Sequence, residues 1–178
     1  IIINLWLLYI MKKYEEVLKE WFGFDNFRNK QLEIIKAVLE NKKDVCAILA
    51  TGAGKSLCFQ FPAVFTNKTC LVVSSLISLM NDQRLKLTEL GIPSCCLNST
   101  VSNKNFLKEE ILENEYRLVY TTPEYLILQE EFVTELVERD ILCLICVDES
   151  HVVSTWAQDF REAYKKLTSV ISNPTPGQ

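Results

Sequence analysis

The chain has 178 residues, 48% of them hydrophobic, and a formal net charge of −4 at pH 7. This length allows one compact domain with a substantial core and is too short for two ordinary domains with a linker. The negative charge excludes the overall basic surface that often marks a nucleic-acid-binding domain, so any such contact must come from local groups. Seven cysteines in hydrophobic segments favour reduced thiols of an intracellular protein over a disulfide scaffold.

Residues 1–10 form an apolar stretch that is shorter than the roughly 20 residues of a membrane-spanning helix. No basic residue precedes it, so we predict neither a membrane span nor a signal peptide. Because a helical pattern starts directly after Met11, we expect residues 1–10 to be an extension that is not native. Residues 11–171 are then the domain, and residues 172–178 a frayed tail. A natural peptide covering residues 4–12, detected by mass spectrometry, would contradict this interpretation of the extension.

Helices and strands are predicted from the spacing of apolar residues along the chain. Helical patterns are found at residues 12–21, 28–39, 55–61, 76–90, 106–114 and 131–139. Strand-length apolar runs are found at residues 45–49, 70–73, 118–120 and 141–147, with a shorter one at 94–97. The runs are continuously hydrophobic, as strands covered on both faces are. This alternation predicts an α/β fold with a doubly wound, mostly parallel sheet and a ligand crevice beyond the carboxyl ends of the strands.

A glycine-rich loop lies between the first predicted strand and the helix that follows it, in the sequence Ala50-Thr-Gly-Ala-Gly-Lys-Ser56. Small residues in this position let successive backbone N–H groups surround a polyphosphate at the start of a helix. We predict that Lys55 reaches the terminal phosphates of ATP and that Ser56 holds Mg²⁺. The generic P-loop pattern has a glycine where this chain has Leu49, so the match is to the abbreviated form.

Two adjacent carboxylates, Asp148 and Glu149, follow the last predicted strand and should lie in the same crevice. Asp148 is predicted to bind Mg²⁺, and Glu149 to orient and deprotonate the water that attacks the γ-phosphate. Cys143 and Cys146 have the spacing of half a zinc site but lie inside the last apolar run, so we interpret them, like Cys95 and Cys96, as strand residues.

Asp-Glu-x-His at residues 148–151, after a Thr-Gly-x-Gly-Lys-Ser loop, resembles superfamily 2 helicases. The segments at residues 22–31, 71–83, 121–124 and 152–164 are similar to those of RecQ-type DNA helicases. This resemblance implies the first RecA-like, P-loop lobe of an ATP-dependent 3′–5′ DNA helicase that acts in repair and recombination in the nucleus. It also implies single-stranded or forked DNA as partner, and a second motor lobe that is absent here.

The resemblance also implies roles for individual residues. Residues of the segment ahead of the loop frame the adenine, and Gln31 can offer it both a donor and an acceptor. The nucleotide-binding residues are then Phe24, Phe27, Arg28, Gln31, Thr51, Gly52, Ala53, Gly54, Lys55 and Ser56. The DNA-contacting or coupling residues are Ser74, Ser75, Thr122, Trp156, Phe160 and Arg161. His151 joins Lys55, Asp148 and Glu149 as a catalytic residue and bridges the ATP site to the second lobe.

Three alternatives stay open. Trp156, Phe160 and Tyr164 have a spacing of four, so they can also form one buried helix face instead of stacking on bases. An RNA-directed helicase would fit the glycine-rich loop and the acid pair equally well. The third alternative is a catalytically silent module that binds nucleotide or a partner. No arginine finger of a second lobe is present, so hydrolysis of ATP by this chain alone should be slow or nil.

Overall fold

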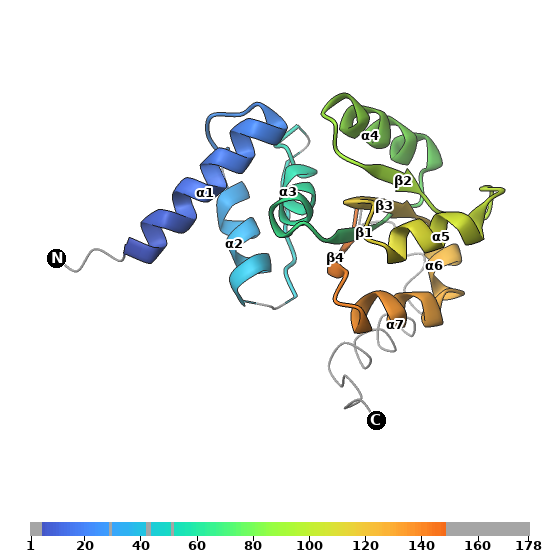
Figure 1. Ribbon diagram of the computed structural model, residues 1–178. Coiled ribbons are helices and arrows are strands. Elements are labelled where there is room, and N and C mark those ends of the chain that lie inside the picture. Colours follow the sequence, from blue (N-terminus) through green and yellow to red (C-terminus); the bar gives the residue numbers. More distant parts are fainter. Residues whose placement is uncertain (1–4, 29, 42–43, 51, 149–178) are drawn as a thin grey trace.

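The computed structural model describes residues 5–28, 30–41, 44–50 and 52–148, and it shows helices on both sides of one small sheet (Figure 1). In chain order the elements are α1 (Leu5–Phe22), α2 (Gln31–Asn41), α3 (Leu57–Thr66), β1 (Thr69–Val73), α4 (Ile77–Glu89), β2 (Ser94–Cys96), α5 (Lys104–Leu112), β3 (Leu118–Thr121), α6 (Pro123–Ile127), α7 (Glu130–Glu138) and β4 (Leu142–Val147).

The sheet has four strands in the order β2-β3-β1-β4, and every neighbouring pair is parallel. Parallel neighbours need crossover connections, which the helices between the strands provide. This arrangement confirms the predicted α/β class with a parallel sheet and helices on both faces. The strand order reverses around β1, and in open α/β sheets ligands generally bind beyond the carboxyl ends of the strands at such a point.

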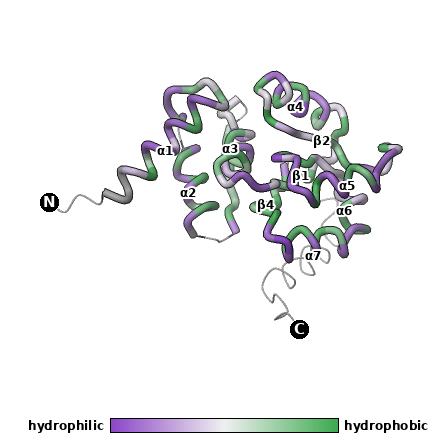
Figure 2. Tube along the Cα trace, viewed as in Figure 1, coloured by the Kyte–Doolittle hydropathy of each residue, from purple (hydrophilic) through white to green (hydrophobic). Residues whose placement is uncertain are grey.

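Successive residues of β1 point into two different cores because side chains alternate across a strand. Cys70 and Val72 belong to the first core cluster, which α1, α2, α3 and α4 cover. Leu71 and Val73 belong to the second, which α5, α6 and α7 cover. All five residues of β1 are buried. Hydrophobic residues gather along β4, whereas the surface helix α4 carries both kinds of residue (Figure 2).

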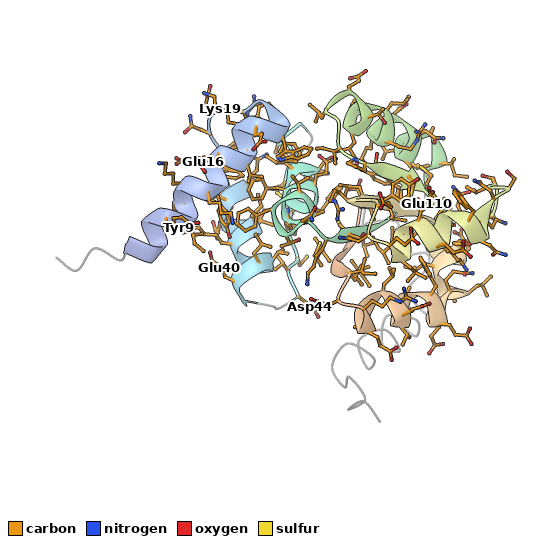
Figure 3. All side chains as sticks on the ribbon, viewed as in Figure 1. Tyr9, Glu16, Lys19, Glu40, Asp44 and Glu110 are labelled. Atoms are coloured by element: carbon orange, nitrogen blue, oxygen red, sulfur yellow. The ribbon has the colours of Figure 1, made fainter. Side chains whose placement is uncertain are left out.

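An aromatic cluster in the first core fixes α3 against α1. The ring of Phe61, which is fully buried, makes edge contacts with Tyr14 and Phe27 at centroid distances of 5.5 and 5.1 Å. It also stacks on Phe65 at 5.7 Å with an interplanar angle of 17°. At the opposite side of α1, Lys19 is exposed and pairs with Asp25 at 2.8 Å (Figure 3). The apolar side of α1 is therefore what attaches it to the domain.

The strand predicted for residues 45–49 is wrong. Residues 44–50 have no helical or strand structure, and the side chain of Ile48 is 94% exposed. A strand forms only where a neighbouring strand exchanges backbone hydrogen bonds with it, and none of the described strands pairs with residues 44–50. Among the described residues, none pairs with the outer edge of β4.

The first helix begins at Leu5, inside the apolar stretch, and not at residue 12 as predicted. The helix therefore continues without interruption through Met11 to Phe22. Within the part of the chain that the structure describes, no helix has the length and apolar character that crossing a membrane requires.

Cys143 and Cys146 lie in β4, and Cys95 and Cys96 lie in β2, as the strand interpretation predicted. Burial is the main influence on their thiols. It raises the pKa of Cys143 to about 11 and the pKa of Cys146 to about 12. These thiols are therefore neutral at pH 7, and neutral thiols are poor nucleophiles and poor metal ligands.

Candidate functional site: a glycine-rich loop and a strand-end carboxylate

The glycine-rich loop turns through two left-handed glycines directly before α3. Gly52 has a φ of +80° and Gly54 a φ of +78°, which other residues rarely adopt. The amide of Ala53 donates to the carbonyl of Ala50 at 3.1 Å, which closes the first turn. Left-handed residues that alternate with right-handed ones can form concave backbone sites for anions. The two left-handed glycines directly before α3 are compatible with such a site at the start of the helix.

Gln31, at the start of α2, is hydrogen-bonded to this loop through its side chain. Its side-chain amide Nε2 donates to the carbonyl of Gly54 at 3.0 Å, and its Oε1 accepts from the amide of Arg28 at 2.7 Å. Gln31 is 3% exposed, so these bonds are made in a dry environment. The sequence predicted that Gln31 binds adenine. The structure places its side chain between the adenine-framing segment and the phosphate loop.

Gly54 is the position in the loop with least room for a side chain. A Cβ atom there would lie 2.4 Å from Nε2 of Gln31 and would also meet a left-handed φ. We therefore expect Gly54→Ala to lower the free energy of unfolding by at least about 1–2 kcal/mol, the cost of a left-handed alanine before any clash. Urea unfolding followed by circular dichroism would measure it.

The matched control is Gly52→Ala, which has the same left-handed strain, because a Cβ at Gly52 meets no atom within 4 Å. The difference between the two variants isolates the Gln31 contact. Equal unfolding free energies for both would contradict a tight contact between Gln31 and the loop.

The residues predicted to frame the adenine divide into two groups. Phe24 is 44% exposed, and the guanidinium of Arg28 lies over its ring at 5.7 Å from the centroid. Phe27 instead packs edge-on against Phe61 in the first core. Phe24 and Arg28 thus offer an accessible flat surface beside the loop, while Phe27 anchors the segment that carries them.

Lys55 and Ser56 lie between the loop and α3, and both are half-buried. The backbone already bends helically here, since Cys58 N donates to Lys55 O at 2.9 Å. Ser56 is the residue before α3, and within the described residues its side chain makes no capping hydrogen bond to the helix. A lysine ammonium and a serine hydroxyl beside left-handed loop glycines suit a phosphate and its Mg²⁺. The residues present therefore fit Mg-ATP.

Asp148 follows β4 at the carboxyl end of the sheet. Its amide donates to the carbonyl of Val73 at 3.0 Å, which extends the pairing of β4 with β1 by one residue. Its carboxylate oxygen Oδ2 accepts a hydrogen bond of 3.1 Å from Gln83 of α4. The helix that follows the phosphate loop, α3, packs against β4. Asp148 therefore follows the strand that this helix contacts. Gln83 ends the segment 71–83 that resembles RecQ-type helicases, but the sequence analysis assigned it no role at this site.

The predicted DNA-contacting residues of the described chain also lie at strand ends. Ser74 follows β1, is 3% exposed, and its hydroxyl accepts from the amide of Leu76 at 3.5 Å. Ser75 next to it is half-buried. Thr122 follows β3, and its hydroxyl caps α6 by accepting from the amide of Tyr125 at 3.4 Å. The two serines and Thr122 are thus brought to the same edge of the sheet as Asp148.

Several predicted residues lie outside the described part of the chain, and their roles stay predictions. They are Thr51, Glu149, His151, Trp156, Phe160 and Arg161. The predicted tail at residues 172–178 lies outside it as well.

The chain matches the family model of the DEAD/DEAH box helicases over residues 28–178. It is 46% identical over 157 residues to a protein of Acanthamoeba polyphaga mimivirus that is provisionally named an ATP-dependent RNA helicase, R290. It is 42% identical over 153 residues to the mouse bifunctional 3′-5′ exonuclease/ATP-dependent helicase WRN, and 38% identical over 160 residues to the ATP-dependent DNA helicase RecQ of Bacillus subtilis. These alignments confirm the predicted resemblance to RecQ-type helicases.

The alignments cover 88%, 86% and 89% of this chain but 28%, 11% and 27% of the three relatives. The chain therefore spans less than a third of each. Among solved structures, a hypothetical ATP-dependent RNA helicase from Sulfolobus tokodaii matches with a TM-score of 0.61 and 20% identity. That match covers 91% of this chain and 47% of the other, and at such low identity it shows a shared fold alone.

Proposed function

The chain belongs to the DEAD/DEAH box helicase family, and on this premise we propose that it is the ATP-binding lobe of a RecQ-type DNA helicase. The observation that carries the proposal is the paired placement of a left-handed glycine loop before α3 and a carboxylate directly after β4. Such a pair supports binding of a nucleoside triphosphate with its metal ion, and transfer of the terminal phosphoryl group to water.

Each side chain of the site has one task in this proposal. The loop amides and the start of α3 bind the phosphates, and Lys55 adds a positive charge to the terminal ones. Ser56 and Asp148 hold Mg²⁺, which neutralises phosphate charge when bound. Glu149 takes the proton from the attacking water, and His151 connects the site to a second lobe. Phe24 and Arg28 offer the adenine their exposed faces.

The wider role rests on the resemblance to RecQ-type helicases and on the relatives named above. We propose 3′–5′ movement along single-stranded or forked DNA, in repair and recombination in the nucleus. A second motor lobe would complete the ATP site with an arginine. Because a transition-state arginine accelerates related phosphoryl transfers by about 10³–10⁵-fold, the 178 residues assayed alone are expected to bind ATP and to hydrolyse it slowly.

An RNA helicase is the second candidate, since the 46% identical mimivirus relative carries an RNA-helicase name. We expect unlabelled single-stranded DNA to displace a labelled DNA strand from the chain more effectively than RNA of the same sequence and length. Fluorescence anisotropy in the presence of Mg-ATP, at one fixed salt concentration, measures both competitions. Stronger displacement by RNA would overturn the choice of DNA.

A further inference from the structure

A chain of partly buried hydrogen bonds leads from the core of the sheet to the carboxylate of Asp148. The hydroxyl of Tyr120, in β3, donates to Oε1 of Gln83 at 3.1 Å. The side-chain amide of Gln83, in α4, donates through Nε2 to Oδ2 of Asp148 at 3.1 Å. The sequence separations are 37 and 65 residues, so only the fold brings these three side chains together.

The chemistry of the groups fixes the direction of every bond. An ionised carboxylate can only accept, so the atom of Gln83 that faces Asp148 must be the NH₂ group. The carbonyl oxygen of Gln83 then faces Tyr120, whose hydroxyl must donate. Burial raises the pKa of the Tyr120 hydroxyl, and this effect is larger than the lowering of the pKa by a hydrogen bond with Gln60. The hydroxyl therefore keeps its proton at neutral pH. Each donor therefore meets an acceptor, with no conflict along the chain.

The burial of Tyr120 makes this arrangement rigid. Tyr120 is fully buried in the first core, and the backbone of β3 on which it stands is paired on both sides. Gln83 is held by α4, whose residues Met80 and Leu87 are buried against the same core. Gln60, the other partner of Tyr120, belongs to α3, the helix that follows the phosphate loop.

We propose that Gln83 is a positioning residue that fixes the orientation of the Asp148 carboxylate toward Mg²⁺, and that Tyr120 fixes Gln83 in turn. A donor on Oδ2 restricts rotation of the carboxylate about its Cβ–Cγ bond and so sets where its other oxygen points. Outer hydrogen-bond partners of metal-binding carboxylates have this effect in general. The inference rests on the proposed function, because it takes Asp148 as a metal-binding residue.

The test compares Gln83→Met with the wild-type chain. Methionine keeps the length and volume of the side chain and removes both hydrogen bonds. Mn²⁺ replaces Mg²⁺ as the probe, because the electron paramagnetic resonance signal of free Mn²⁺ falls as the ion binds. The loss of signal caused by ATP alone is measured without protein and subtracted. We expect Mn²⁺ to bind about 10-fold more weakly to Gln83→Met in the presence of ATP, since loss of such partners typically costs about 10- to 100-fold in metal affinity.

Two further variants separate positioning from a merely structural role. Tyr120→Phe removes one hydroxyl without changing the shape of the core, and it should weaken Mn²⁺ binding in the same direction by a smaller factor. Lys86→Met, on an exposed position of α4, should leave Mn²⁺ binding unchanged. Binding of ATP in the presence of a metal chelator should be equal in all four proteins, because the phosphate loop is untouched.

The outcomes distinguish the two proposals. If the wild-type chain takes up no Mn²⁺ with ATP, the proposal that this chain by itself binds Mg-ATP fails, and the inference fails with it. If the wild type binds Mn²⁺ and both Gln83→Met and Tyr120→Phe bind it equally well, the positioning role is overturned while the ATP-binding lobe stands. A melting temperature lowered in Gln83→Met without any change in Mn²⁺ affinity would also overturn it.

Discussion

Lys55→Ala is expected to weaken Mg-ATP binding by about 10- to 100-fold, which corresponds to the roughly 1.5–3 kcal/mol that hydrogen bonds to charged groups contribute. Lys55 is half-buried at the end of the glycine-rich loop, where an ammonium group can meet phosphate without full exposure to water. Removing the ammonium leaves the loop backbone unchanged, since Lys55 contributes its carbonyl to the first turn of α3 through Cys58. Calorimetric titration of the whole chain with Mg-ATP measures the change.

Lys68→Ala is the matched control for Lys55→Ala. Lys68 precedes β1 at the amino end of the sheet and forms an ion pair with Asp140 at 2.6 Å, away from the carboxyl ends of the strands. Its loss should leave ATP affinity unchanged. Equal affinity of wild type and Lys55→Ala would exclude the proposed nucleotide site. No binding by a correctly folded wild type would favour the silent module, or a site that requires the second lobe.

Phe61→Ala is expected to have the largest effect on stability, a loss of about 3–5 kcal/mol in the free energy of unfolding. Its ring is fully buried and touches Tyr14, Phe27 and Phe65, so truncation leaves a cavity lined by rigid rings that cannot collapse easily. Domains of this size have total stabilities of about 5–15 kcal/mol, so this loss would remove a large share of the free energy of unfolding.

Urea unfolding monitored by circular dichroism measures the effect of Phe61→Ala. Phe106→Ala on α5 removes the same ring from a side chain that is 58% exposed and should change the free energy by about 0.5 kcal/mol or less. Similar losses in both variants would show that the aromatic cluster around Phe61 is not a main source of stability.

Most of the sheet could be predicted from the sequence because strands covered on both faces are apolar throughout. The predicted runs at residues 70–73, 118–120 and 141–147 coincide closely with β1, β3 and β4. The run at residues 45–49 looks the same in sequence and is exposed in the structure. Apolar composition shows that a segment can be a strand, but whether it pairs with another strand depends on the tertiary arrangement, which no local pattern reveals.

The candidate site was predictable where its residues are adjacent in sequence and not where they come together through the fold. The glycines, Lys55 and Asp148 were selected because loop and strand-end motifs are local. Gln83 is a single polar residue in an ordinary helix, and its contact with Asp148 lies 65 residues away. The sequence selected Gln31 as an adenine-binding residue but did not predict its bonds to the loop carbonyls. Those bonds span 22 and 23 residues, so they too depend on the fold.

The alternation of side chains along β1 has a consequence for how the chain loses its structure. Cys70 and Val72 pack in one core, and Leu71 and Val73 pack in the other. Unfolding of β1 would therefore remove side chains from both cores at once. The cores therefore behave as one cooperative unit and not as two subdomains. Heat or denaturant should release the phosphate loop and the helices on the opposite face in the same transition.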